Sequence, residues 1–299
     1  MENNLTLNKE MWKKIREVEI KTSKVVSDLF SGDYKSTFKG KGLDFKEFKE
    51  YEQGDDPKYI DWKVSAKTGS IHVKKFSEER ELTLIIALDV SNSTLFGSNI
   101  QLKRELAIEF TASIAFSGMK NNDKVGLILF SDHIVEFIPP KKGRNHVIRI
   151  LKTIISYTYK KDSAKYTDIN KPLKLINKLF NKKVIIFFVS DFLADGFEKE
   201  IKITSYKHDL IGVIINDSRE YNIPAVGLIE MQDNETNERY LLDTSDKKIM
   251  LALKDNLNKK YEVRDNIFIK NRIDKITLTT DQSYIIPLNN FFKRREKRV

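Results

Sequence analysis

Three short side chains that carry oxygen atoms follow an aliphatic run in the stretch LTLIIALDVSNSTLFGS, residues 82–98. Asp89, Ser91 and Ser93 are spaced two apart, so in an extended or looping segment one carboxylate and two hydroxyls point the same way. Oxygen ligands of low total charge suit Mg²⁺, which prefers six oxygens in an octahedron. The alternative is structural, with Ser91 or Ser93 only capping the following helix.

Two further segments carry side chains of the same kind. Thr167 and Asp168 stand in KYTDINKPL, directly before a predicted helix, and Ser190 and Asp191 end the aliphatic run in VIIFFVSDFL. Ligands of open parallel sheets bind beyond the carboxyl ends of the strands. Helix capping explains Thr167 or Asp168 individually, but it does not explain three segments that converge on one edge. The pattern therefore favours a divalent cation site.

The elements that would position these side chains alternate regularly from residue 81 onward. Nearly continuous aliphatic strands separated by amphipathic helices are typical of a mostly parallel sheet with both faces covered. We therefore predict an α/β fold with a doubly wound, mostly parallel sheet flanked by helices. The predicted strands are 82–88, 125–130, 134–138, 184–189 and 210–215, and the predicted helices are 99–119, 145–158, 169–180 and 197–206.

The remainder of the chain is predicted to surround this sheet. Apolar residues at helical spacing in the first thirty residues predict a helix, and residues 32–80 predict turns with one strand at 71–76. We expect residues 1–80 to form an N-terminal helix and small β/turn extension that packs on a main domain of 81–299. Within that domain the sequence predicts a hairpin at about 226–243. A helix at 246–264, a strand near 276–278 and a final basic helix follow.

Composition excludes several classes of protein. The 299 residues include no cysteine, which removes thiol catalysis, cysteine-based zinc sites, iron–sulfur clusters and disulfides. The N-terminus lacks the apolar core of a signal peptide, and no stretch approaches the roughly 18 apolar residues of a membrane helix. The expected location is the cytoplasm.

The formal charge of +10 leaves a second kind of function open. Clustered lysine and arginine would bind nucleic acid or an anionic membrane surface. Most lysines alternate with glutamates, as on solvated faces, and only the tail Lys293–Arg298 is a dense basic run. A nucleic-acid- or membrane-associated protein that uses this tail is the alternative hypothesis.

Catalysis is not indicated by these residues. The four histidines, at positions 72, 133, 146 and 208, are scattered and lack metal-ligand spacing. Ser91 stands where a phosphoaspartate phosphatase would carry its second carboxylate, and no phosphate-binding glycine loop is present. Metal-assisted hydrolysis also needs a base beside the ion, and the candidate ligands do not offer one. We therefore predict a binding protein and not an enzyme.

The order D-V-S-N-S, then Thr167, then Asp191 resembles the metal-ion-dependent adhesion site of von Willebrand factor A domains. The resemblance implies a von Willebrand factor A-like, Rossmann-like fold. It also implies that Asp89, Ser91, Ser93, Thr167 and Asp191 hold Mg²⁺ or Mn²⁺, with an acidic residue of a protein partner in the open position.

Other segments resemble the bacterial domain-of-unknown-function family fifty-eight. These are GKGLDF at 40–45, YEQGDDPKYIDWKVSAK at 51–67, VKKFSEER at 73–80 and DSREYNIPAVGLIE at 217–230. The sequence departs from the family's arginines at Phe48, Lys58 and Lys67. The resemblance implies a MoxR-type AAA+ ATPase as partner, in assembly or remodelling of other proteins. For Gly54–Trp62 the residues favour a proline turn followed by a buried tryptophan with a capping carboxylate.

Overall fold

A six-stranded sheet forms the centre of the protein, with the strand order β10-β7-β6-β3-β4-β5. The computed structural model describes residues 12–13, 15–22, 44–77, 81–97, 101–158, 166–232 and 239–298. All neighbouring strands are parallel except β5, which runs antiparallel to β4. The strands are β3 (Thr83–Asp89), β4 (Lys124–Phe130), β5 (Ile134–Lys141), β6 (Ile185–Ser190), β7 (Asp209–Asn216) and β10 (Asp274–Thr279).

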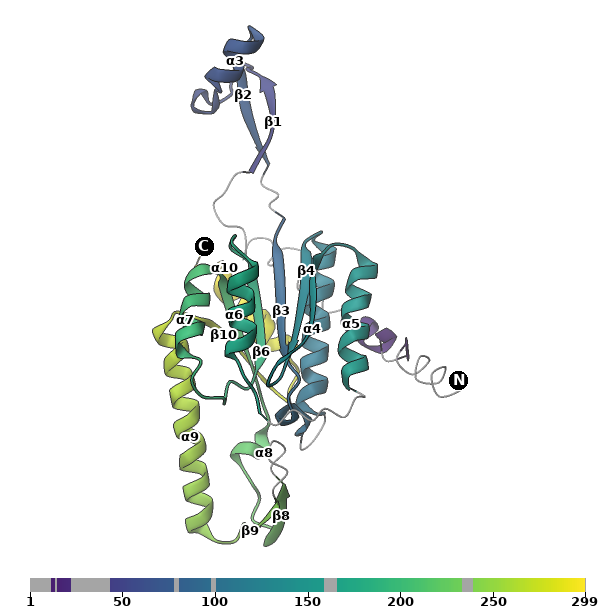
Figure 1. Cartoon of the computed structure of the whole chain (residues 1–299), viewed down its shortest axis with the longest axis vertical. Coiled ribbons are helices and arrows are strands. Elements are labelled where there is room, and N and C mark those ends of the chain that lie inside the picture. Colours follow the sequence, from purple (N-terminus) through teal and green to yellow (C-terminus); the bar gives the residue numbers. More distant parts are fainter. Residues whose placement is uncertain are drawn as a thin grey trace.

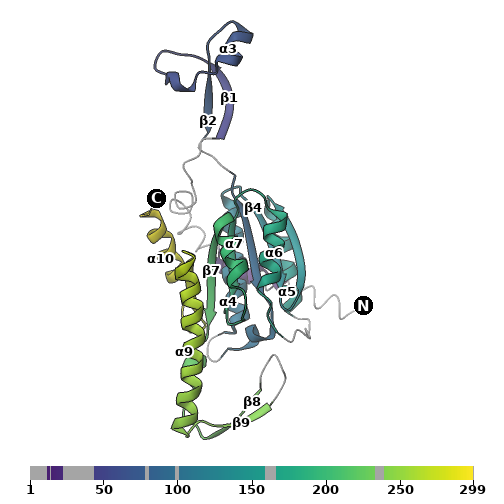
Figure 2. The same ribbon diagram turned by 60° about the vertical axis from the view of Figure 1, so that its left-hand side comes forward.

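Helices cover both faces of this sheet, as the alternating pattern predicts (Figures 1 and 2). Alternate residues of β3 point to opposite faces, so Leu84 and Ile86 enter one core and Ile85 and Ala87 enter the other. The first core contains side chains of α4 (Lys103–Lys120), α5 (Arg144–Thr158) and α10 (Ile285–Glu296). The second contains side chains of α6 (Asn170–Leu179), α7 (Glu198–Lys207) and the C-terminal half of α9 (Lys247–Lys270). The predicted doubly wound α/β fold is confirmed.

The described N-terminal residues belong to two separate pieces. Residues 12–13 and 15–22 are helical, and Ile15 and Val18 enter the core with α4 and α5. The antiparallel strands β1 (Asp44–Glu50) and β2 (His72–Ser77) lie beyond the end of the sheet in both views, together with η1 (Pro57–Tyr59) and α3 (Trp62–Thr68). Residues 23–43, which the predicted helix and turns partly occupy, lie outside the described residues. The division at residue 80 stays a prediction.

One expectation for this piece is wrong. Asp61 caps α3 as predicted, because its carboxylate accepts hydrogen bonds from the backbone amides of Lys63 and Val64. Trp62, however, is 70% exposed and not buried. The helix is seven residues long and rests on a two-stranded hairpin, which offers too little surface to cover an indole.

Elements near the carboxyl ends of the strands complete the fold. The predicted hairpin consists of β8 (Leu228–Gln232) and β9 (Arg239–Asp243), which pair antiparallel. The short helices η2 (Asn92–Leu95) and α8 (Ser218–Tyr221) follow β3 and β7. Two predicted helices have different bounds: the one after β3 begins later, at Lys103, and α9 continues to Lys270, beyond the predicted end at 264.

Candidate metal centre

Asp89 ends β3 next to β6, at the point where the strand order reverses. Connections from β3 lead towards β4, and those from β6 lead towards β7, so the loops diverge here and leave room for a ligand. Ser190 ends β6, and its hydroxyl donates a 2.7 Å hydrogen bond to Asp89 Oδ2. The backbone amide of Ser91 donates to Asp89 Oδ1 at 2.9 Å. Both carboxylate oxygens of this buried side chain therefore have fixed directions.

The hydroxyls of Ser91 and Ser93 lie side by side. Their oxygens are 3.0 Å apart and share a hydrogen bond. Adjacent oxygens around an octahedral Mg²⁺, at metal–oxygen distances of about 2.1 Å, are separated by roughly 3.0 Å as well. Ser91 precedes η2, but in the described residues its side chain makes no capping hydrogen bond. A cap by Ser91 is therefore not observed, and because 3.0 Å is also the length of an ordinary hydrogen bond, the role of the pair as metal ligands stays a prediction.

Asp191 follows Ser190 and lines a small cavity together with Asp89, whereas Ser91, Ser93 and Thr167 are not among the lining residues of that cavity. Asp89, Asp191, Thr94 and Lys103 all line this cavity of about 10 Å³, roughly the volume of one water-sized sphere. Asp191 Oδ1 accepts a hydrogen bond from the amide of Leu193 at 3.2 Å. Phe192, which follows Asp191, is buried and has a positive φ of 56°. A positive φ is unfavourable for a residue with a side chain, and such residues occur often at functional sites.

The Thr167 segment is brought to the same edge from another direction. The amide of Asp168 donates a 2.9 Å hydrogen bond to the carbonyl of Ser131, which directly follows β4. Because β4 is the other neighbour of β3, this contact anchors the segment beside the end of the strand that carries Asp89. Thr167 itself is half-buried. Its place among the ligands stays a prediction.

The chain matches the family model described as "Protein of unknown function DUF58" over residues 47–262. It belongs to this family. Uncharacterized proteins of Mycobacterium bovis and Mycobacterium tuberculosis are each 25% identical to this DUF58 protein over 223 residues, which is 74% of this chain and 70% of theirs.

Solved structures with a similar arrangement include two from Bacteroides. The conserved hypothetical protein BatB of Bacteroides thetaiotaomicron is 18% identical, with a TM-score of 0.45, over 72% of this chain and 99% of its own. An aerotolerance-related membrane protein of Bacteroides fragilis is also 18% identical, with a TM-score of 0.48, over 73% and 100%. Among the described residues of the DUF58 protein, no helix combines the length and apolar character needed to cross a membrane.

Buried carboxylates dominate the electrostatics of the DUF58 site. Burial, followed by the negative charge of Asp191, raises the pKa of Asp89 to about 7. The hydrogen bonds from Ser91 and Ser190 oppose this rise without cancelling it. Across the described chain, no three histidine, cysteine, aspartate or glutamate side chains are grouped so that they could hold a metal ion. A cation here would therefore depend on hydroxyl oxygens as well as carboxylates.

Lys103 is a buried cation beside this site that sequence reasoning missed. Its side chain is 2% exposed, and its ammonium binds the carboxylate of Glu220 and lies 3.8 Å from Asp191 Oδ2. Burial raises the pKa of Glu220 even though Lys103 favours its ionised form. In the sequence, Lys103 begins the charged run KRELAIEF and has the pattern of a solvated helix end. No local signal distinguishes it from the many exposed lysines of this chain.

Arg104, also missed, holds the turn that carries the two serines. Its buried guanidinium donates hydrogen bonds to the carbonyl of Val90 at 3.0 Å and to Thr94 Oγ1 at 3.2 Å. Thr94 Oγ1 in turn donates to the carbonyl of Ser91 at 2.6 Å. These contacts fix the backbone on both sides of Ser91, so the hydroxyl is oriented before any ligand arrives.

If the candidate site binds a divalent cation, we expect Arg104→Lys to weaken that binding by about 10- to 100-fold, which is typical when groups that orient metal ligands are lost. A lysine cannot reproduce the planar fork that reaches both acceptors. Isothermal titration with Mg²⁺ and Mn²⁺ measures the change. The matched control is Arg144→Lys, because Arg144 pairs with Glu19 at the exposed surface, away from the site. Equal affinity in both variants would show that Arg104 does not orient the ligands.

Proposed function

We propose that this DUF58 protein is a divalent-metal-dependent protein-binding module of the von Willebrand factor A type. The observation that carries the proposal is the convergence at one sheet edge of the buried Asp89 with the hydroxyls of Ser91 and Ser93, whose hydrogen-bonded oxygens lie 3.0 Å apart, a separation that neighbouring ligands of an octahedral ion would also have. Asp89, Ser91, Ser93, Thr167 and Asp191 would hold Mg²⁺ or Mn²⁺. When bound, the ion supplies an electrophilic position that takes a carboxylate oxygen from a protein partner.

The donor set fits such an ion chemically. Burial of Asp89, followed by the negative charge of Asp191, raises the pKa of Asp89, so its ionised form carries a free-energy cost. Lys103 offsets it only in part, because its ammonium is shared with Glu220. A divalent cation would neutralise the remaining charge. Hydroxyl ligands add no charge of their own, so the bound ion would stay electron-poor enough to attract a partner's acid.

Binding is preferred over catalysis because each acid of the site has another role in this proposal. Asp89 and Asp191 would hold the cation, and Glu220 binds Lys103 and the amide of Asp217. A general base would need an acceptor within hydrogen-bond reach of the proton it removes. A charge-assisted contact from a partner's carboxylate would instead let one residue dominate the interface.

The partner we propose is a MoxR-type AAA+ ATPase or one of its clients, on the basis of the family resemblance. Affinity capture of the purified ATPase, in Mg²⁺ and in EDTA, tests this. Wild-type protein should retain the ATPase only in Mg²⁺, and the double variant Ser91→Ala with Ser93→Ala should lose it. Ser156→Ala, which removes an exposed hydroxyl on α5, should behave as wild type. Equal capture in Mg²⁺ and EDTA would refute the metal-dependent mechanism.

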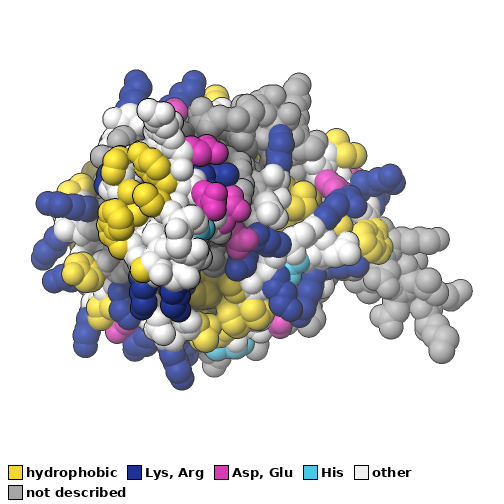
Figure 3. Space-filling model, turned by 90° about the horizontal axis from the view of Figure 1, so that it is seen from above, with side chains coloured by type: hydrophobic (Ala, Val, Ile, Leu, Met, Phe, Trp, Pro, Cys, Tyr) yellow, Lys and Arg dark blue, Asp and Glu magenta, His cyan; other side chains and the backbone are white. Residues whose placement is uncertain are grey.

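The basic-tail alternative loses part of its support. Arg295 binds Asp209 through two short contacts, and Arg298 lies 3.0 Å from Asp274, so these tail charges neutralise acids of this chain. Seen from the end that carries β1, β2 and α3, lysine and arginine side chains are spread around the outline, with acidic and hydrophobic side chains between them (Figure 3). Binding to nucleic acid through phosphates would fall steeply with salt, whereas metal-dependent capture would not.

A further inference from the structure

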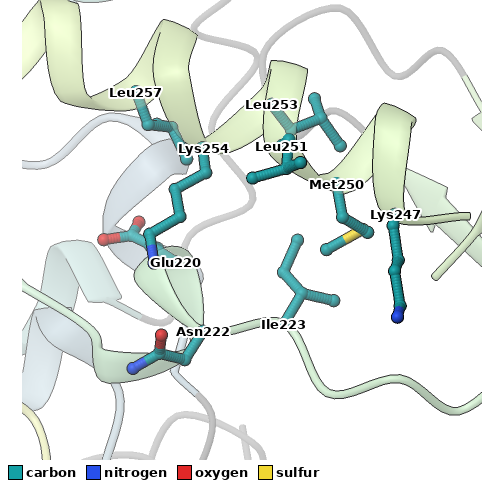
Figure 4. A pocket seen from close by; sticks show the side chains of 9 residues that line it. All are labelled: Glu220, Asn222, Ile223, Lys247, Met250, Leu251, Leu253, Lys254 and Leu257. Atoms are coloured by element: carbon teal, nitrogen blue, oxygen red, sulfur yellow. The ribbon is translucent and has the colours of Figure 1, made fainter. Parts of the chain in front are cut away.

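A groove of about 370 Å³ lies between α8 with the two residues after it and the first three turns of α9. Met250, Leu253 and Leu257 are half-buried residues of α9 at helical spacing, and they line it on one side. Ile223 projects into it from the opposite side (Figure 4). The stretch 247–257 of a helix is about 15 Å long, so the groove matches two to three helical turns of a second segment.

The half of α9 that lines the groove lacks a core of its own. The buried residues of α9 all lie in its second half, between Tyr261 and Phe268. In the first half Leu251, which also lines the groove, is 61% exposed, and Ile249 is 43% exposed. Apolar anchors at three- and four-residue spacing on an uncovered helix are the surface that an amphipathic helix recognises.

Two lysines and one acid line the groove, and this balance favours an acidic occupant. Lys247 and Lys248 stand in the first turn of α9, which contains no acidic residue. The N-cap of the same helix is Asp246, whose carboxylate accepts hydrogen bonds from the amides of Lys248 and Ile249 and stabilises this helix end. Lys254 lies on the groove and points toward Glu220, the one acid of its lining (Figure 4). Glu220 is already paired with Lys103.

One ion pair, between Glu220 and Lys103, links the groove to the candidate metal centre. Glu220 lines the groove, and its partner Lys103 lies 3.8 Å from Asp191 Oδ2. A partner that covers this ion pair would contact both places. We infer that the groove binds an acidic amphipathic helix of the same protein partner whose carboxylate completes the metal site. This inference rests on the proposed function and adds the structural class and charge of the partner.

Two synthetic helical peptides with identical leucine spacing test the inference on the full chain, one with glutamates and one with lysines on the polar face. Fluorescence anisotropy should show that the acidic peptide binds at least about tenfold more tightly than the basic one. Leu253→Asp should weaken the binding of the acidic peptide by about tenfold or more. Lys247→Glu with Lys254→Glu should reverse the preference between the two peptides.

Ile269→Asp is the matched control, because Ile269 is an exposed apolar residue of the same helix far from the groove. It should leave both affinities unchanged, and circular dichroism confirms that each variant is folded. Equal affinity for the two peptides, or an unchanged affinity in Leu253→Asp, would overturn the inference. A dimer of this chain that Leu253→Asp dissociates would also overturn it, by assigning the groove to a second copy.

Calorimetry with Mg²⁺ alone separates this inference from the proposed function. Uptake of Mg²⁺ without a preference for the acidic peptide overturns the groove assignment and leaves the metal centre intact. A preference for the acidic peptide without uptake of Mg²⁺ supports the groove as a site for acidic helices, and it refutes the metal-dependent function.

Discussion

Asp89→Asn should make the metal-free protein more stable at pH 8, by on the order of 2–4 kcal/mol in the free energy of unfolding. The pKa of Asp89 is about 7 in the folded protein, against an ordinary value of 3.8. The folded state therefore binds the proton more tightly than the unfolded state does. The stability that this proton contributes is fully present below pH 4 and is lost as pH rises through 7. Asparagine cannot ionise, so the variant avoids the loss.

A divalent cation should make wild type more stable than Asp89→Asn. A ligand present at 100 times its dissociation constant adds about 2.7 kcal/mol to the free energy of unfolding of the protein that binds it. Wild type should gain this stability in Mg²⁺ or Mn²⁺, and Asp89→Asn should gain none. Urea unfolding at pH 5 and pH 8, in EDTA and in Mg²⁺, provides the measurement.

Asp255→Asn is the control for this experiment, since Asp255 is an exposed residue of α9. Its stability should stay within about 0.5 kcal/mol of wild type in every condition. If Asp89→Asn is less stable than wild type at pH 8 in EDTA, the ionised carboxylate of Asp89 does not destabilise the folded protein. If Asp89→Asn keeps a full response to Mg²⁺, Asp89 is not a ligand.

Lys103→Met should lower the free energy of unfolding by about 3–5 kcal/mol, as expected when one member of a buried ion pair is removed. The substitution leaves the carboxylates of Glu220 and Asp191 close together without their shared cation. Adding Glu220→Gln should restore much of the loss, because the raised pKa of Glu220 shows that its ionised form is already disfavoured by burial. A double-mutant cycle from urea unfolding gives the coupling energy.

The matched control is Lys21→Met. Lys21 binds Glu109 at 2.7 Å, but its side chain is largely exposed to solvent. Exposed ion pairs contribute about 0.2–1 kcal/mol, so this variant should change little. A loss in Lys103→Met no larger than that in Lys21→Met would mean that the buried pair does not hold α4 and α8 together.

The elements whose pattern is local could be predicted from the amino-acid sequence. The aliphatic runs that form β3, β4, β6 and β7 are continuous because both faces of their sheet are covered, and the amphipathic stretches between them form the covering helices. The positions of Asp89 and Asp191 at strand ends follow from the same pattern. Parallel strands bring their carboxyl ends to one edge, so the order of residues along the chain was enough to indicate these candidate ligands.

The burial of charged and aromatic side chains, in contrast, depends on the three-dimensional packing. In the sequence Lys103 resembles any solvated lysine. Its partner Glu220 lies on α8, 117 residues further along the chain, so only the tertiary structure brings the two together. Trp62 shows the opposite case, since its indole is exposed and the described residues include no second layer over its hairpin. The groove beside α9 is likewise formed by segments that are separate in sequence. Burial depends on which distant elements meet, and hydrophobic periodicity within one segment carries no information about that.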